Sequence, residues 1–438
     1  MDPFLVKAIQ LILSLSLLIV LHELGHFVPA KLFKTRVEKF FLFFDVKFAL
    51  FKKKIGDTVY GIGWLPLGGY VKISGMIDES MDKEQMAQPP KEWEFRSKPA
   101  WQRLIIMLGG VTVNLVLGFL IYMMIMFVWG KAYVGPDEMP EGFAVVDSFK
   151  EYGFQDGDKI LQVNGKEFEN SLDINKHLFM RDVRNITVLH ENGEKETINI
   201  PEEIGVQMFE QGVMQPFVPI NHPVLDTVVE NMAAAKAGLK KGDSIISLNN
   251  KEIGYWHEIA PISTENKQKE IEVVYKRDGK ILSTKVQPDD DGKLGIAPVT
   301  GIEIKRKTFG FSESISKGFD YGYWTLRDYV YQFKYVFSKK GASQLGGFGA
   351  IGGLFPDTWN WAGFWHTTAL LSIILAFMNI LPIPALDGGH VMFLLYEMVT
   401  GRKPNDKFME IAQMVGFFLL IALVLYANGN DIYRWLFE

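Results

Sequence analysis

Four long apolar stretches interrupt an otherwise mixed chain, and each is long enough to form a membrane-crossing helix. They run over residues 4–28, 104–129, 361–381 and 408–426, and about 20 helical residues span the hydrocarbon core of a bilayer. The first stretch has neither a strongly charged leader nor a small-residue cleavage site, so we expect it to remain in the mature protein. The pattern therefore predicts a polytopic α-helical membrane protein with four transmembrane helices.

The basic residues predict how these helices are oriented. Lysines and arginines gather in the loop between the first two stretches and in the loop between the last two, whereas the tails carry only Lys7 and Arg434. Because basic loops face the cytoplasm, we expect both termini and the long segment 131–360 on the other side. In a bacterium with an outer membrane, that side of the inner membrane is the periplasm.

The long segment between the second and third stretches contains an internal repeat. One copy reads GFQDGDKI from Gly153 and continues as ILQVNGKEF; the other reads GLKKGDSI from Gly238 and continues as IISLNNKEI. Asn-Gly and Asn-Asn tolerate the positive φ of tight hairpins, which predicts two copies of one small β-rich module. Each copy resembles a PDZ domain of the bacterial protease type, although any small β domain with a tight turn would share the pattern.

A strand-rich element and an aromatic segment are expected to lie against the membrane, and a polar loop follows the first of them. Residues 35–74 read as strands with a turn at 54–57, and the polar stretch 78–98 reads as a loop. Aromatic residues recur at almost every second position over 319–337, which fits a strand or an interfacial helix equally well. We expect this segment to lie at the outer membrane interface as an anchor, with a gating role as the alternative.

Composition removes several classes of function. The 438 residues include no cysteine, which excludes disulfides, thiol nucleophiles, iron–sulfur clusters and cysteine-based zinc fingers. The net charge of −5 gives no basic field for nucleic acid, and we expect neither a nucleic-acid partner nor a nucleotide cofactor. A hydrophobic fraction of 48% fits a chain that is part membrane-embedded and part soluble.

The end of the first apolar stretch carries the strongest chemical signal, the sequence His22-Glu23-Leu24-Gly25-His26. On a helix, residues four apart share a face, so both imidazoles can bind one metal ion while the glutamate serves as a general base. The alternative is a pair of structural histidines. Ionisable groups inside an apolar span are costly to insert and usually functional, so we expect His22 and His26 to be metal ligands.

Two histidines leave a catalytic zinc ion one protein ligand short. The best candidate is Asp387, in the segment NILPIPALDGGH that ends the third apolar stretch at the same predicted membrane depth. Taken alone, Asp387-Gly388 is an ordinary turn, and the prolines would end a helix whatever the function. Paired with an intramembrane HExxH, Asp387 becomes the expected third ligand.

Together, these segments resemble the site-2 protease family of intramembrane metalloproteases, whose motifs are HExxH and NxxPxPxLDG. The resemblance implies one Zn²⁺ per chain held by His22, His26 and Asp387, with Glu23 as the general base. It also implies that Asn379 hydrogen-bonds the substrate strand or the developing oxyanion. A further family motif, GxxxN, is matched by Gly110 and Asn114, where Asn114 supports the substrate or simply bridges two helices; Val111 and Phe348 depart from the family pattern.

The resemblance also implies how a helical substrate becomes cleavable. A transmembrane helix hides its peptide bonds, and an edge strand around Gly68, Gly69 and Tyr70 would pair with an unwound substrate and expose them. The expected substrates are single-span membrane proteins of the anti-sigma-factor type and remnant signal peptides, and the PDZ pair would admit those whose bulky ectodomain has been removed. The competing hypotheses are a PDZ scaffold without activity and a metal-transport protein.

The expected domain organisation follows from these assignments. It comprises a first transmembrane helix with HExxH (1–34), a cytoplasmic β-element and loop (35–100), a second transmembrane helix (101–130), PDZ domains (131–215 and 216–302), an aromatic periplasmic segment (303–360), a third transmembrane helix with the aspartate motif (361–390), and a cytoplasmic loop with the fourth helix (391–438).

Overall fold

The computed structural model describes residues 2–66, 68–76, 88–336, 338, 341 and 345–437. Part of the loop predicted over 78–98 therefore lies outside the described residues, as does the last residue of the aromatic stretch. The chain divides into two compact units. The first comprises Met1–Gly130 with Thr308–Glu438, and the second comprises Lys131–Lys307.

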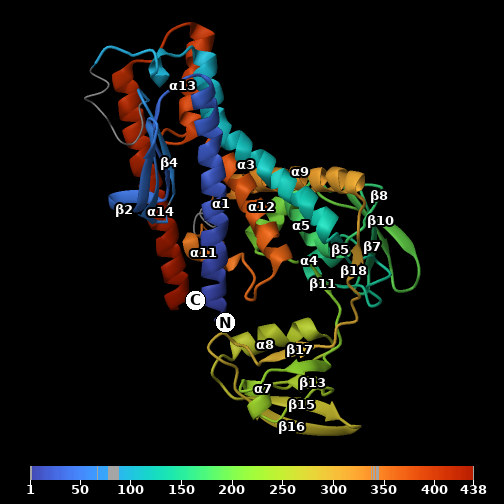
Figure 1. Ribbon diagram of the computed structural model, residues 1–438. Coiled ribbons are helices and arrows are strands. Elements are labelled where there is room, and N and C mark those ends of the chain that lie inside the picture. The colour runs from blue at the N-terminus through green and yellow to red at the C-terminus, as the bar shows by residue number, and fades with distance from the viewer. Residues whose placement is uncertain are drawn as a thin grey trace. The chain divides into compact units, whose positions relative to one another are not determined.

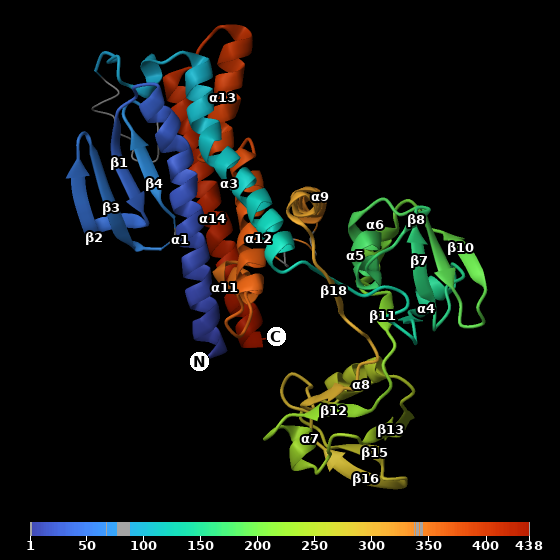
Figure 2. The same ribbon diagram turned by 45° about the vertical axis from the view of Figure 1, so that its right-hand side comes forward.

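The first unit is built around four long apolar helices, as the hydropathy pattern predicts (Figure 1). They are α1 (Pro3–Leu32), α3 (Ala100–Val128), α12 (Trp361–Ile380) and α14 (Asp406–Phe437), and each is long and apolar enough to cross a membrane. Helix α3 packs against both α1 and α12. The start of α1 and the end of α14 lie at the same end of this helix group (Figures 1 and 2).

Glycines allow α1 and α3 to approach until their backbones touch. A Cβ atom on Gly25 would lie 2.4 Å from the carbonyl oxygen of Gly109, and one on Gly109 would lie 1.9 Å from that of Gly25. Such small-residue contacts are the usual means of close helix packing in membranes. The contact joins the helical turn that carries the HExxH motif directly to α3.

The aromatic stretch forms a helix, α9 (Phe311–Val336), and not a strand. Its buried face carries Ser314, Gly318 and Gly322 at a spacing of four, and a Cβ on Gly318 would lie 2.4 Å from the Cα of Met123 in α3. Large residues such as Tyr323 remain exposed on the other face. The helix is therefore amphipathic, with a small-residue stripe seated on α3.

Shorter elements complete the first unit. They are a 3-10 turn (Phe95–Ser97), α11 (Phe348–Gly353) and α13 (Asp387–Thr400). A four-stranded sheet lies beside α1 (Figure 2) and has the order β2-β3-β1-β4, from the strands β1 (Val37–Leu42), β2 (Phe44–Ile55), β3 (Thr58–Leu65) and β4 (Tyr70–Ile73). Strand β4 pairs antiparallel with β1 and forms one edge of the sheet.

The second unit contains two small sheets with the same strand order. The first, β10-β9-β7-β8, is formed by β7 (Lys159–Val163), β8 (Lys166–Glu167), β9 (Asn185–Leu189) and β10 (Lys195–Asn199). The second, which read in the same direction is β16-β15-β13-β14, is formed by β13 (Ser244–Leu248), β14 (Lys251–Glu252), β15 (Ile271–Arg277) and β16 (Lys280–Val286). Both predicted hairpins, β7–β8 and β13–β14, are confirmed, and their turn residues have positive φ.

Short helices and two-stranded ribbons complete the second unit, around two separate apolar cores. The helices are α4 (Asp147–Lys150), α5 (Ile174–Met180), α6 (Ile204–Gln211), α7 (Ala233–Lys236) and α8 (Ile259–Glu265), with 3-10 turns at Ser171–Asp173 and Trp256–Glu258. The ribbons pair β5 (Lys131–Tyr133) with β18 (Lys305–Lys307), β6 (Phe143–Val145) with β11 (Phe217–Pro219), and β12 (Leu225–Val228) with β17 (Ile296–Pro298).

The repeated Gly-Asp turn is anchored differently in the two copies. In the first, the buried carboxylate of Asp158 lies 2.6 Å from Nδ1 of His190, while in the second, Asp243 accepts two hydrogen bonds from Arg277. Lys159 pairs with Leu189 and Ser244 pairs with Lys276. His190 and Arg277 therefore occupy equivalent positions, so one copy has a titratable partner for its aspartate and the other a permanent cation.

Candidate metal centre

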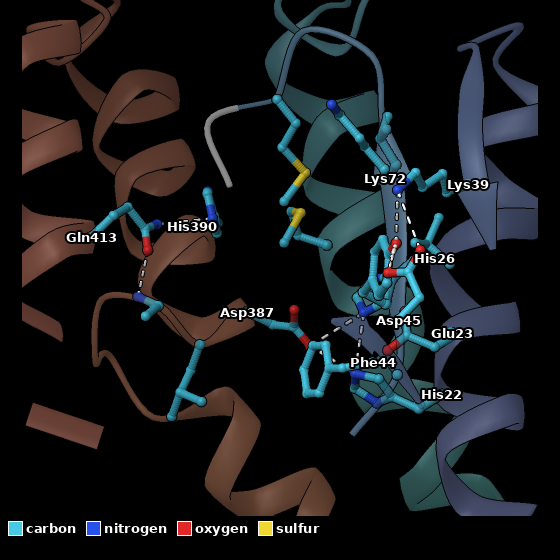
Figure 3. A pocket seen from close by; sticks show the side chains of 18 of the residues that line it. His22, Glu23, His26, Lys39, Phe44, Asp45, Lys72, Asp387, His390 and Gln413 are labelled. Carbon is cyan, nitrogen blue, oxygen red and sulfur yellow. Dashed lines mark hydrogen bonds and ion pairs between the residues drawn. The ribbon is translucent and has the colours of Figure 1, made fainter. Parts of the chain in front are cut away.

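Helix α1 presents His22, Glu23 and His26 from a single turn, as the HExxH spacing predicts. The imidazole rings of His22 and His26 meet edge to face with centroids 4.8 Å apart, and their Nε2 atoms are separated by 3.2 Å. Figure 3 shows both imidazoles and the Glu23 side chain on the same side of the helix, facing Asp387. The two histidine donors therefore already converge on one point.

A glycine of α3 makes room for both imidazoles. A Cβ on Gly110 would lie 2.4 Å from Nε2 of His26 and 2.6 Å from Cε1 of His22, well inside van der Waals contact. Since α1 and α3 touch backbone to backbone at the adjoining residues Gly25 and Gly109, the helices cannot separate to give the rings more room. The two rings can therefore occupy this position only because residue 110 has no side chain.

The remaining ring nitrogens are held by α3. Nδ1 of His26 lies 2.8 Å from the carbonyl oxygen of Ile106 and therefore donates to it, while Nδ1 of His22 lies 3.2 Å from the side-chain amide of Asn114. Asn114 Oδ1 is buried and has no hydrogen-bond partner among the described residues. With the side-chain amide turned so that Oδ1 faces the imidazole, Oδ1 accepts a hydrogen bond from the Nδ1–H of His22. Both Nε2 atoms then offer free lone pairs towards Asp387.

Asp387 reaches this point from a tight turn that follows α12. Helix α12 ends at Ile380 before two prolines, and Asp387 is the first residue of α13. Gly388 has no space for a side chain, because its Cβ would lie 2.1 Å from the carbonyl oxygen of Leu381. This compact turn places Oδ2 of Asp387 3.3 Å from Nε2 of both His22 and His26.

The three donors fit a zinc ion. Their separations of 3.2, 3.3 and 3.3 Å form a nearly equilateral triangle, and ligands about 2.0–2.1 Å from a tetrahedral zinc ion are about 3.3–3.4 Å apart. Oδ2 of Asp387 is buried and makes no hydrogen bond of good geometry among the described residues. An orphaned carboxylate oxygen facing two imidazole lone pairs is the arrangement that a divalent cation satisfies.

A cavity of about 460 Å³ opens at the triangle and is lined by His22, Glu23, His26 and Asp387. Edge strand β4 forms another wall, so a peptide lying in the cavity can run alongside this strand. The backbone of Val71 in β4 hydrogen-bonds the Glu23 carboxylate. The predicted base is therefore fixed between the metal donors and the edge strand.

The strand residues predicted to face a substrate are positioned in different ways. Gly69 and Tyr70 line the cavity, and the Tyr70 hydroxyl accepts from Lys39 at 3.1 Å and donates to Asp45 at 2.8 Å. Gly68 has φ of +155° and packs against the ring of Phe44. Gly69 has no space for a side chain, since its Cβ would lie 2.5 Å from a methyl carbon of Ile19.

The two predicted asparagines separate. Asn114 contacts His22, as described above, whereas Asn379 is half-buried in the last turn of α12 and is not among the described residues that line the cavity. Sequence reasoning noticed neither Gln413, which lines the cavity from α14, nor the contact of Gly110 with the imidazoles. A lone glutamine in the apolar sequence of α14 is a signal that could have identified it.

Comparison with known proteins agrees with this chemistry. The model of peptidase family M50 matches residues 10–423. The chain is 28% identical to a protein of Borreliella burgdorferi provisionally named a zinc metalloprotease, over 96% of this chain and 97% of that one. It is 27% identical to the regulator of sigma E protease of Haemophilus influenzae, over 97% and 98%, and 27% identical to the regulator of sigma-E protease RseP of Salmonella typhimurium, over 97% of each chain.

These matches cover nearly the whole chain, including both motifs and the segment between them. They confirm the family predicted from HExxH and NxxPxPxLDG. The donor chemistry, the apolar helices and the comparisons agree: the chain belongs to peptidase family M50 and is a zinc metalloprotease with membrane helices.

Proposed function

We propose that this metalloprotease cleaves peptide bonds within the membrane-embedded segments of single-span proteins. The observation that carries the proposal is the donor triangle of His22, His26 and Asp387, with Glu23 beside it, on a helix that is itself long and apolar enough to span a bilayer. His22 is ten residues, or about 15 Å, from the end of α1 at Leu32. The reacting bond would then lie within the membrane.

In this proposal, one Zn²⁺ is held by Nε2 of His22, Nε2 of His26 and Oδ2 of Asp387. Zinc supplies Lewis acidity that polarises the scissile carbonyl and acidifies water. Asn114 and the Ile106 carbonyl keep the Nδ1 protons of the two histidines away from the metal, which fixes the ligating tautomer. The contact of Asn114 with His22 favours this orienting role over contact with the substrate.

Glu23 would act as the general base. Its carboxylate receives the proton of the attacking water and returns it to the amide nitrogen of the leaving strand. The hydrogen bond from the Val71 backbone orients the carboxylate towards the cavity, and a backbone N–H does not protonate the carboxylate. Asn379 remains our candidate for hydrogen-bonding the substrate or the developing oxyanion.

Edge strand β4 would present the substrate in an extended form. A helical segment hides its carbonyls in its own hydrogen bonds, whereas a segment paired with β4 exposes alternate peptide groups to the cavity. Gly68 and Gly69 precede this strand and Tyr70 begins it, and of these three Gly69 and Tyr70 line the cavity. Helix-weakening residues in the substrate would favour such pairing.

We further propose that the two modules of the second unit are PDZ domains that restrict which substrates reach the site. The repeated Gly-Asp turn and the shared strand order support this assignment. The basic loops favour termini and modules in the periplasm and a catalytic site near the cytoplasmic face of a bacterial inner membrane. The names of the Haemophilus and Salmonella relatives favour anti-sigma factors as substrates, with remnant signal peptides as a second class.

The test expresses wild type and Glu23→Gln in cells with a tagged single-span substrate that lacks its ectodomain. We expect cleavage by wild type only, with about one zinc per chain in both purified proteins. Zinc in both without cleavage of any trimmed substrate would favour a scaffold, and zinc flux across vesicles would favour a transporter. Absence of bound metal from wild type would refute the proposal.

A further inference from the structure

Helix α14 contacts the turn between α12 and α13, which leads into Asp387, through very few residues. Of its described residues, only Gln413 and Gly416 are buried. A Cβ on Gly416 would lie 1.9 Å from the carbonyl oxygen of Pro384, so α14 lies directly against the turn between α12 and α13. These two positions, one helical turn apart, join the fourth helix to the segment that carries Asp387.

The side chain of Gln413 holds this segment at two points. Its Oε1 accepts a hydrogen bond of 2.5 Å from the backbone N–H of Ala385, and its Nε2 lies 2.8 Å from Nε2 of His390. A backbone N–H can only donate, which fixes the amide oxygen at Ala385 and the NH₂ group at His390. The amide therefore bridges the residues two before and three after Asp387 (Figure 3).

The bridged turn is strained and needs such support. Ala385 has φ of +75°, a left-handed conformation that is strained for a residue other than glycine and persists only where the surroundings enforce it. The Gln413 hydrogen bond engages that same residue. Two residues later, Asp387 must place one oxygen within 3.3 Å of two imidazoles on a different helix.

We propose that Gln413 is a positioning residue that holds the Ala385 turn, and through it the Asp387 carboxylate, in the metal-binding geometry. The inference rests on the proposed metal site and adds a residue that neither motif contains. A donor displaced by about 1 Å loses its bond to the metal, and partners that orient ligands in this way typically contribute 10–100-fold in metal affinity.

The test compares wild type with Gln413→Met, which fills similar space without either hydrogen bond, and Gln413→Glu, which keeps an acceptor for Ala385. The exposed neighbour Met414, varied as Met414→Ala, is the matched control. Each full-length protein is titrated with Zn²⁺ against a chelator, and its Co²⁺ form is examined by absorption spectroscopy, because the ligand-field bands report coordination geometry independently of folding. Cleavage of the trimmed substrate is measured in parallel.

We expect Gln413→Met to lose about 10–100-fold in zinc affinity, with shifted Co²⁺ bands and slower cleavage. Gln413→Glu should recover the band positions, and Met414→Ala should match wild type. Wild-type affinity and bands in Gln413→Met, or a Gln413→Glu variant no better than Gln413→Met, would overturn the positioning role. Failure of wild type itself to bind zinc would instead refute the proposed site, so the two failures are distinguishable.

Discussion

Replacing Gly110 with alanine should disable the metal site by adding a single methyl group. That carbon would lie 2.4 Å from Nε2 of His26, 2.6 Å from Cε1 of His22 and 2.8 Å from Nδ1 of His22, whereas ordinary contacts begin near 3.4 Å. The rings would have to move by about 1 Å. The backbone contact between Gly25 and Gly109 prevents the helices from separating to relieve the crowding.

The size of the effect follows from the donor triangle. Its sides of 3.2–3.3 Å match a tetrahedral ion closely, and an ångström of displacement in one donor removes that match. We expect zinc affinity to fall by at least about 10–100-fold and cleavage by about 100-fold or more. Alanine favours a helix over glycine by about 1 kcal/mol, so the loss cannot come from a weakened helix.

The assay measures zinc affinity by chelator competition and cleavage of the trimmed substrate, for wild type, Gly110→Ala and Thr112→Ala. Thr112 is exposed on the same helix, so Thr112→Ala should retain both properties. If Gly110→Ala binds zinc as tightly as wild type, the histidines do not occupy the position described here. Equal losses of zinc affinity and cleavage in both variants would show that the effect comes from a general disturbance of α3 and not from contact with the imidazoles.

Three other perturbations test separate parts of the structure. Asn114→Leu should weaken zinc binding by about 10–100-fold, because the His22 ring loses the partner that orients it. Gly318→Val should detach α9 from α3, and cysteines introduced at their contact should cross-link less; the natural chain has no cysteine to interfere. In the first module, burial works to lower the pKa of His190, but its hydrogen bonds to Asp158 and Glu196 prevail and raise it. A histidine whose pKa is raised by folding stabilises the folded module below about pH 6.5, and this stabilisation is lost as the pH rises through the pKa of the folded state. Amide hydrogen exchange in β7 and β9 should therefore accelerate between about pH 6 and 8 by more than its intrinsic pH dependence.

Each of these expectations has a contrasting control. Asn114→Asp keeps an acceptor for His22 and should retain more affinity than Asn114→Leu. Ser316→Val changes an exposed position of α9 and should leave the cross-link unchanged. His190→Arg gives the first module the arrangement of the second, in which burial acts to raise the pKa of Asp243 but the hydrogen bonds from Arg277 outweigh burial and lower that pKa. Because arginine stays charged over this range, the faster exchange above about pH 6 should disappear in this variant. Its persistence would assign the effect to another group.

Local sequence patterns were sufficient for the helices and for the histidine pair. Mean hydropathy located the four long helices, because a span needs an unbroken apolar run, although α14 continues to Phe437, eleven residues beyond its predicted end. The HExxH motif depends only on helical periodicity, so the convergence of His22 and His26 is encoded within five residues. The hairpins at Asn164-Gly165 and Asn249-Asn250 are equally local, because their backbone requires positive φ.

Contacts between distant segments were harder to infer. The aromatic stretch fitted a strand and an interfacial helix equally well, and the structure selects the helix, whose Gly318 and Gly322 pack against α3. The proximity of Asp387 to the histidines is not encoded in any local pattern; it was predicted from the missing third ligand and the shared membrane depth, with support from the family resemblance. Gln413 escaped attention because its partners, Ala385 and His390, are identifiable only once α14 is placed beside the turn.

Metal analysis of the Asp387→Ala variant tests the central claim most directly, because that claim joins two segments more than 350 residues apart. Zinc content and affinity by chelator competition are compared for purified wild type, Glu23→Gln and Asp387→Ala. The donor triangle predicts about one zinc per chain, bound equally tightly, in wild type and Glu23→Gln, and much weaker binding in Asp387→Ala. Wild-type zinc affinity in Asp387→Ala would show that this carboxylate is not the third ligand and would contradict the account.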